Sequence, residues 1–177
     1  ESARELSTTQ PVTASQILSI EALGAQLGIA NESLEGFAKT VSGLDIATNM
    51  DAETAGKEMA RFKNIVGMAD EDMQRYGSTI VAIGNNMATT ESETSQMAMR
   101  LASAGHQAGM SESEILGLSA AMSSLGVKAE MGGSALSQVF IKISNAVTEG
   151  GSALDAFASR SNMTSEQFAS AWKENAA

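Results

Sequence analysis

The sequence contains no cysteine, a single proline (Pro11) and few aromatic residues. Without cysteine, the chain can form neither a disulfide framework nor a thiolate metal site. Aromatic residues make up 4% of the 177 residues and apolar residues 43%, so the core must consist mainly of Ala, Leu, Ile and Met. The eleven methionines suit such a core because their flexible side chains fill irregular gaps.

Positive charge and long apolar runs are also scarce. The chain has eleven Lys and Arg residues and 21 Asp and Glu residues, which gives a formal net charge of −10. Because this charge repels phosphate, we expect no specific nucleic acid binding. No apolar run approaches the roughly 20 residues of a membrane span, so we expect none in this fragment. The chain begins at Glu1 rather than Met, and we therefore expect it to be part of a longer protein.

A short turn motif recurs along the chain: Gly or Asn, then an apolar residue, then a residue that caps helices. Gly and Asn adopt the left-handed conformation that ends a helix, and the apolar residue packs back against that helix. Asn, Asp, Ser or Thr then accepts hydrogen bonds from the first N–H groups of the next helix. The motif predicts these helix-capping and turn positions: Gly28, Asn31, Asn49, Asp51, Gly67, Asp70, Asn86, Thr90, Gly109, Ser111, Gly126, Asn162 and Thr164.

Apolar residues between these turns recur at helical spacing, as in Leu34, Phe37, Val41 and Leu44, and no segment alternates like a strand. We therefore predict an all-α fold, a compact bundle of about eight or nine short helices with tight Gly/Asn-capped turns. Apart from the turns, the segments share few side chains, so the sequence does not establish a solenoid of identical repeats.

The chain divides into three predicted parts. Residues 1–12 are polar and are expected to form a flexible lead-in, and residues 13–149 the main helical domain. Residues 150–177 begin with two glycines and are expected to form a short C-terminal helical pair, packed on that domain or leading to the next segment.

No residue pattern predicts chemistry. His106 is the only histidine and has no recognisable catalytic or metal-binding partner. Glu91 and Glu93 are two residues apart on a helix and therefore point to different faces. We predict that the chain is not an enzyme and that it has no catalytic, metal or cofactor site.

Three stretches resemble a known family. Residues 76–100 and 109–130, with Gly132-Gly-Ser-Ala-Leu136 after them, are similar to the core region of bacteriophage tail tape measure proteins. Asn162-Met-Thr-Ser-Glu-Gln-Phe168 resembles that family's Gly-Met-Ser-Glu-Glu-Phe step, with Asn in place of Gly. The resemblance covers nearly all of the chain from about residue 12.

This resemblance implies a structural role in a phage or prophage tail. Such proteins occupy the tail lumen, set tail length during assembly in the host bacterial cytoplasm, and are expelled to aid genome delivery. The implied partners are the tail tube protein, tail assembly chaperones and baseplate hub proteins, with a trimer or hexamer of the chain itself. Because the predicted helices are short and end at closely spaced turns, we expect a folded module rather than the measuring segment.

Two other functions stay open from the sequence. One is a cytosolic α-helical adaptor that binds a partner helix or peptide in a Met-lined groove. The other is a glycan-cleaving helical enzyme, which lacks a plausible catalytic acid with a defined partner.

Overall fold

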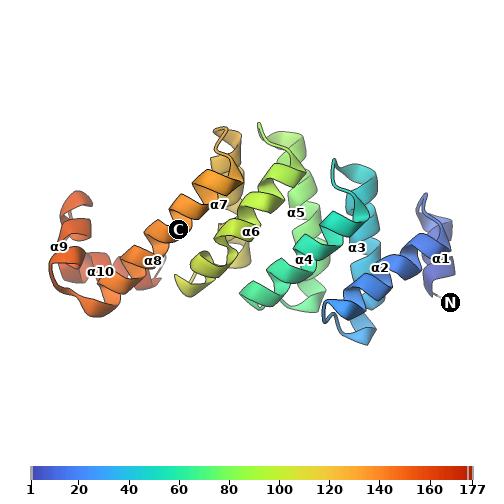
Figure 1. Cartoon of the computed structure of the whole chain (residues 1–177), viewed down its shortest axis with the longest axis horizontal. Coiled ribbons are helices and arrows are strands. Elements are labelled where there is room, and N and C mark those ends of the chain that lie inside the picture. The colour runs from blue at the N-terminus through green and yellow to red at the C-terminus, as the bar shows by residue number, and fades with distance from the viewer. Residues whose placement is uncertain (1, 175, 177) are drawn as a thin grey trace.

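The structure is a computed structural model that describes residues 2–174 and 176, and these residues contain ten α-helices and no strand (Figure 1). The all-α prediction is confirmed, with one helix more than the upper estimate of nine. The helices are α1 (Ser2–Thr9), α2 (Ala14–Gln26), α3 (Leu34–Ala47), α4 (Ala52–Val66), α5 (Met73–Asn86), α6 (Glu91–Gln107), α7 (Glu112–Ser124), α8 (Ser134–Glu149), α9 (Gly151–Arg160) and α10 (Ser165–Glu174).

Most of the helices stand in two parallel rows along the long axis of the molecule (Figure 1). The front row consists of α2, α4, α6 and α8, and the rear row of α3, α5 and α7; neighbours within each row are in contact. Each front helix from α2 to α6 also packs on the rear helix that follows it in the chain. The helices are therefore stacked as successive antiparallel pairs.

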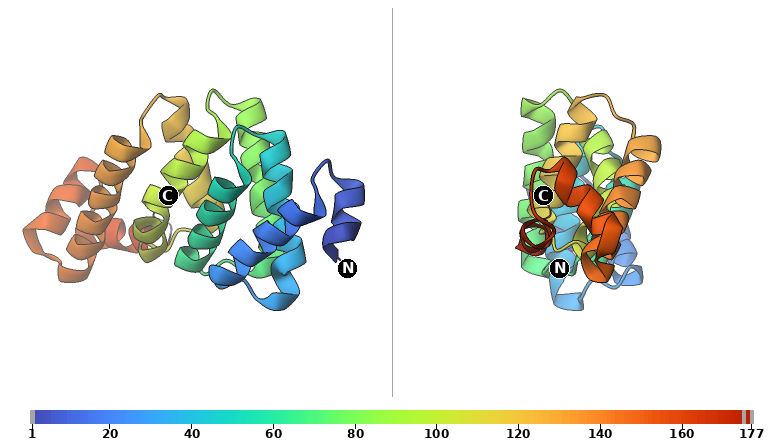
Figure 2. Two further views of the ribbon diagram at one scale, coloured as in Figure 1. Left: turned by 45° about the vertical axis from the view of Figure 1, so that its right-hand side comes forward. Right: turned by 90° about the vertical axis from the view of Figure 1, so that its left-hand side faces the viewer.

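The pairs follow one another at a constant interval. The rear helices begin at Leu34, Met73 and Glu112, so the two intervals between them are equal, and α4 and α6 begin the same interval apart, at Ala52 and Glu91. We call this interval one repeat. The connections within a pair lie at one edge of the stack and those between pairs at the opposite edge (Figures 1 and 2). The repeat that side-chain identity could not establish is thus present in the backbone.

The core lies between the two rows. Phe37, Phe62, Met97 and Leu101 are completely buried there, and the rings of Phe62 and Tyr76 stack with centroids 4.7 Å apart. Most of the remaining space is filled by aliphatic side chains, methionines and alanines, which follows from the low aromatic content.

The segment expected to be a flexible lead-in contains a helix, α1. Ala3 and Leu6 lie three residues apart on this helix and are buried in the core, and the Gln10 side chain donates a hydrogen bond to the Lys39 carbonyl oxygen (3.3 Å). The polar composition conceals this contact because two apolar residues are too few for a visible periodicity. The predicted division at residues 149 and 150 coincides with the turn between α8 and α9.

Candidate functional site

The four predicted turn glycines have the left-handed backbone. The φ angles of Gly28, Gly67, Gly109 and Gly126 lie between 69° and 89°, and that of Asn162 is 55°. In each turn the N–H of the next residue donates to a carbonyl five residues back, as from Met68 to Lys63 (3.1 Å). This bond completes the usual left-handed helix termination.

The apolar residue that follows the glycine is buried where the turn joins the two helices of a pair. Ile29, Met68 and Met110 are each at most 5% exposed. The turn therefore fixes the angle at which the two helices of a pair meet.

Four of the predicted capping residues accept the expected bond. The side chains of Asp51, Thr90, Ser111 and Thr164 accept hydrogen bonds from the backbone N–H three residues later. In the last three, the residue that donates this bond also accepts one back from the capping residue's N–H. Thr13 forms the same reciprocal box with Gln16, which the Thr-x-x-Gln spacing could have indicated.

Asn49 and Asn86 do not adopt the left-handed backbone that the motif predicts for them. Asn49 lies in the connection between α3 and α4, whereas Asn86 is the last residue of α5. These two helices are followed by residues with extended backbone, Thr48 and Met87. Instead, the Asn49 side chain accepts a hydrogen bond from the Ser92 N–H (3.1 Å) at the start of α6. A contact between residues so far apart in the chain has no signal in the local sequence.

Asn31 and Asp70 are also placed differently from the prediction. Each begins a 3₁₀ turn, Asn31–Ser33 or Asp70–Asp72, and neither caps the α-helix that follows. Asp70 forms an ion pair with Lys63 (2.7 Å), and the hydrogen bond from Lys63 is the largest cause that lowers the pKa of Asp70. This pair ties the end of α4 to the turn after it.

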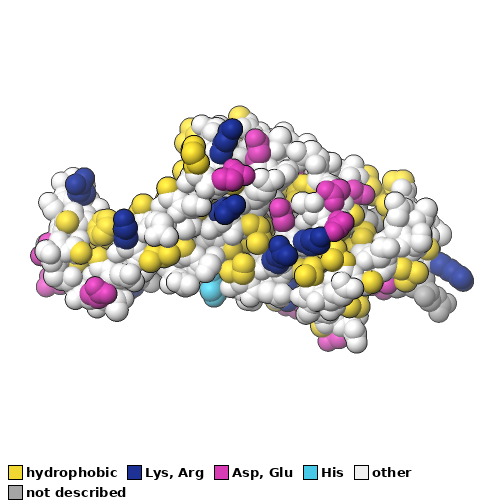
Figure 3. All heavy atoms as spheres, in the orientation of Figure 1, with side chains coloured by type: hydrophobic (Ala, Val, Ile, Leu, Met, Phe, Trp, Pro, Cys, Tyr) yellow, Lys and Arg dark blue, Asp and Glu magenta, His cyan; other side chains and the backbone are white. Residues whose placement is uncertain are grey.

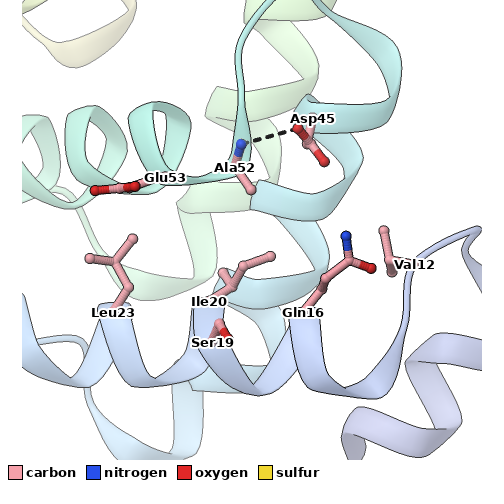
Figure 4. A pocket seen from close by; sticks show the side chains of 8 residues that line it. All are labelled: Val12, Gln16, Ser19, Ile20, Leu23, Asp45, Ala52 and Glu53. Atoms are coloured by element: carbon pink, nitrogen blue, oxygen red, sulfur yellow. Dashed lines mark hydrogen bonds between the residues drawn. The ribbon is translucent and has the colours of Figure 1, made fainter.

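A pocket of about 350 Å³ lies between α2 and the beginning of α4 (Figure 4). Leu23, Ile20 and Gln16 point from α2 toward Ala52 and Glu53, which begin α4. The complete lining is Val12, Gln16, Ser19, Ile20, Leu23, Asp45, Ala52 and Glu53. We call this set the α2–α4 pocket; its inner surface is aliphatic and its charged groups are carboxylates.

The charges of the α2–α4 pocket lie at its rim. One Asp45 carboxylate oxygen accepts a hydrogen bond from the Ala52 N–H (3.1 Å), and Glu53 forms an ion pair with Lys57 one turn along α4. Acidic side chains gather on the same face near the beginning of α4 (Figure 3). This face of the molecule therefore combines exposed carboxylates with an apolar recess.

The rear row has two further hollows. One, of about 340 Å³, lies between α3 and α5 and includes Lys39 and Gly77. The other, of about 200 Å³, lies between α5 and α7, where Arg75 pairs with Glu112 (3.1 Å). Their linings are more polar than that of the α2–α4 pocket.

One acidic side chain is half-buried between front helices. Glu58 of α4 accepts a hydrogen bond from the Ser95 hydroxyl of α6. Burial is the largest cause that raises the pKa of Glu58, and burial also raises the pKa of the nearby Tyr76 phenol. These groups link neighbouring helices, and neither faces the α2–α4 pocket.

Over residues 2–174 and 176, the structure contains no group of three His, Cys, Asp or Glu side chains placed to bind a metal ion. Within the same residues, no helix combines the length and apolarity needed to cross a membrane. His106 is exposed at the end of α6.

Comparison with known proteins bears on the chain as a whole. The family model for phage-related minor tail proteins matches residues 1–174. No significant match is found among curated proteins or among solved structures. Because the family model covers nearly the whole chain, the chain belongs to the phage-related minor tail protein family and is a phage tail protein.

Proposed function

We propose that this chain is a folded module of a tail tape measure protein. In this proposal the parent protein lies in the lumen of the virion tail, sets tail length during assembly in the host cytoplasm and is expelled when the genome is delivered. Its partners are then the tube protein, the assembly chaperones, the baseplate hub and further copies of itself. The membership in the minor tail protein family supports a structural role in the tail.

The observation that carries the module assignment is the interruption of the helices. The longest helix, α6, has 17 residues, which corresponds to about 26 Å at 1.5 Å per residue. A single helix as long as one repeat would span about 60 Å, whereas each helix pair adds only about one interhelical spacing of 10 Å to the stack. A stack of pairs is thus a poor measuring rod, although it forms a stable folded unit.

The proposal includes the absence of enzymatic activity. The adaptor alternative is disfavoured by the burial of three turn methionines. Met50, Met68 and Met110 are each at most 5% exposed and so do not line an open groove. Of the turn methionines, two are exposed: Met87 at 41% and Met163 at 44%. Incubation of the purified chain with peptidoglycan tests the enzymatic alternative, and release of soluble glycan fragments would support it.

Two in-frame deletions of equal length in the parent gene test the tape measure role. The first removes residues 51–89, one complete repeat, and the second removes the same number of residues from an uninterrupted helical segment elsewhere in the parent. Tail length is measured in electron micrographs of the resulting particles.

We expect the second deletion to shorten the tail by about 60 Å and the first by about 10 Å or less. Unchanged length after the second deletion would remove the ruler role. Equal shortening by both deletions would instead show that this segment measures as an extended rod, which contradicts its assignment as a folded module.

A further inference from the structure

We propose that the α2–α4 pocket is a docking site for a partner segment that presents an aliphatic side chain with Lys or Arg beside it. This inference does not rest on the tape measure role. It follows from the lining of the pocket, from the charge at its rim and from a comparison of equivalent positions along the stack.

The shape and lining of the pocket fit an aliphatic anchor. Its volume of about 350 Å³ lies within the usual range for ligand sites, roughly 300–1,000 Å³. Val12, Ile20 and Leu23 supply apolar surface, and Ile20 is only 6% exposed at its inner end. An apolar side chain that enters such a recess lowers the free energy of the complex, because apolar surface on both sides is removed from water.

The carboxylates at the rim of the pocket favour a positive charge on the partner, beside its aliphatic side chain. Asp45 and Glu53 line the pocket, and its lining contains no Lys or Arg. The Asp45 carboxylate accepts a hydrogen bond from the backbone, and the Glu53 side chain is 72% exposed beside Lys57. Both carboxylates can therefore receive a cation from outside, and a carboxylate on the partner would be repelled.

The next junction along the front row explains why this one is open. One repeat later, Gly84 and Glu91 stand at the positions of Asp45 and Ala52. There, the Glu91 side chain lies directly against Gly84, where even a Cβ atom would overlap it. The Glu91 side chain thus fills the space beside Gly84 of α5 where α6 begins, whereas the short Ala52 cannot fill the equivalent space beside Asp45.

One repeat further still, Ser123 and Glu130 stand at these positions, at the junction between α6 and α8. A pocket of about 250 Å³ is present here too, and its lining includes Glu93, Lys128 and Glu130. This pocket shares only the Ser123 and Glu130 positions with the α2–α4 pocket, because its α6 residues are not equivalent to those that α2 contributes. Of these two recesses, the α2–α4 pocket is the one that combines an aliphatic lining with carboxylates alone.

Three blocked tripeptides can probe the site in the 177-residue chain: acetyl-Lys-Leu-Lys-amide, acetyl-Lys-Ala-Lys-amide and acetyl-Glu-Leu-Glu-amide. Binding is followed by NMR through the methyl signals of Ile20, Leu23 and Val12. We expect saturable shifts of these methyls with the Lys-Leu-Lys peptide, about tenfold weaker binding with Ala in place of Leu, and about threefold or greater weakening with Glu in place of Lys.

Two variants separate shape from charge. Asp45→Gly with Ala52→Glu copies the closed junction and should abolish the methyl shifts, with folding checked by circular dichroism. Asp45→Asn with Glu53→Gln keeps the shape, and should bind the Lys-Leu-Lys and Glu-Leu-Glu peptides equally. If the closed variant fails to fold, the second variant still tests the rim.

The proposal fails if the Lys-Leu-Lys peptide produces no saturable shift of these methyls. It fails equally if the Glu-Leu-Glu peptide binds as well as the Lys-Leu-Lys peptide to the unaltered chain. Unchanged binding to a folded closed variant would place the peptide elsewhere and would also overturn the assignment.

Discussion

Single turn residues in this chain act either through their backbone conformation or through their side chains, and residue type alone does not decide which. Gly67 has a φ of 69° and Asn162 a φ of 55°, so both end their helices by a left-handed backbone. Asn49, by contrast, accepts a hydrogen bond from the Ser92 N–H of the following pair. Gly126 has a left-handed backbone although it lies between pairs, so the place of a turn in the stack does not decide this either.

We expect Gly67→Ala to lower the free energy of unfolding by about 1–2 kcal/mol, because a Cβ atom strains the left-handed conformation. Asn86→Ala, at the last residue of α5, which lacks this conformation, is the control and should change the free energy of unfolding by less than about 0.5 kcal/mol. Urea denaturation followed by circular dichroism measures both. Equal losses would contradict the conformational explanation.

Glu58 gives a pH dependence of known sign. Its pKa is raised in the folded state, so the folded chain binds more protons than the unfolded chain between the two pKa values. Stability from this group is therefore present below the unfolded pKa of about 4.3 and is lost as the pH rises through the folded pKa.

We expect Glu58→Gln to remove this loss, so that the variant gains stability relative to the unaltered chain as the pH rises from about 4 to 7. The Ser95 hydroxyl can still donate to the amide oxygen of the variant. Urea denaturation at several pH values measures the difference. A difference that stays constant with pH would contradict the assigned cause.

At the scale of the helices, glycine inside a helix has two opposite roles. A Cβ atom on Gly24 of α2 would lie 2.7 Å from Phe37 Cδ1 of α3, which is too close for unstrained packing. Gly36 of α3 has no atom within 4 Å of that position. The first glycine lets two helices approach, and the second only weakens its own helix.

We expect Gly24→Ala to destabilise the fold by about 1–3 kcal/mol through overpacking. Gly36→Ala should stabilise it by about 0.5–1 kcal/mol because alanine favours the helix. Thermal unfolding of both variants under identical conditions makes the comparison. Stabilisation by both would show that the approach of α2 to α3 adapts without strain.

At the scale of the whole molecule, the stack makes contacts mostly between neighbours, and its C-terminal end is the least buried part. The described residues of α10 include none that is fully buried, and α9 and α10 pack on each other and on α8. The ring centroids of Trp172 in α10 and Phe140 in α8 are 5.7 Å apart. The indole N–H of Trp172 donates a hydrogen bond to the Ser144 hydroxyl (3.2 Å). Such an end can open without the rest of the stack.

We expect the fluorescence of Trp172, the only tryptophan, to change at a lower urea concentration than the far-ultraviolet circular dichroism of the whole chain. Phe140→Ala should lower the fluorescence midpoint further because it removes the ring beside Trp172. Coincident midpoints in both proteins would instead indicate a single cooperative unit.

The sequence by itself determined the all-α class, the approximate positions of the helices after α1 and much of the capping, because these depend on residues close to one another in the chain. It predicted Thr90 as a capping residue correctly for this reason. Only the tertiary structure decided that the helices stack in evenly spaced pairs, that α1 packs against the core, and that a pocket lies between α2 and α4. Those features join residues far apart in the chain, and the side chains that meet there share no local pattern.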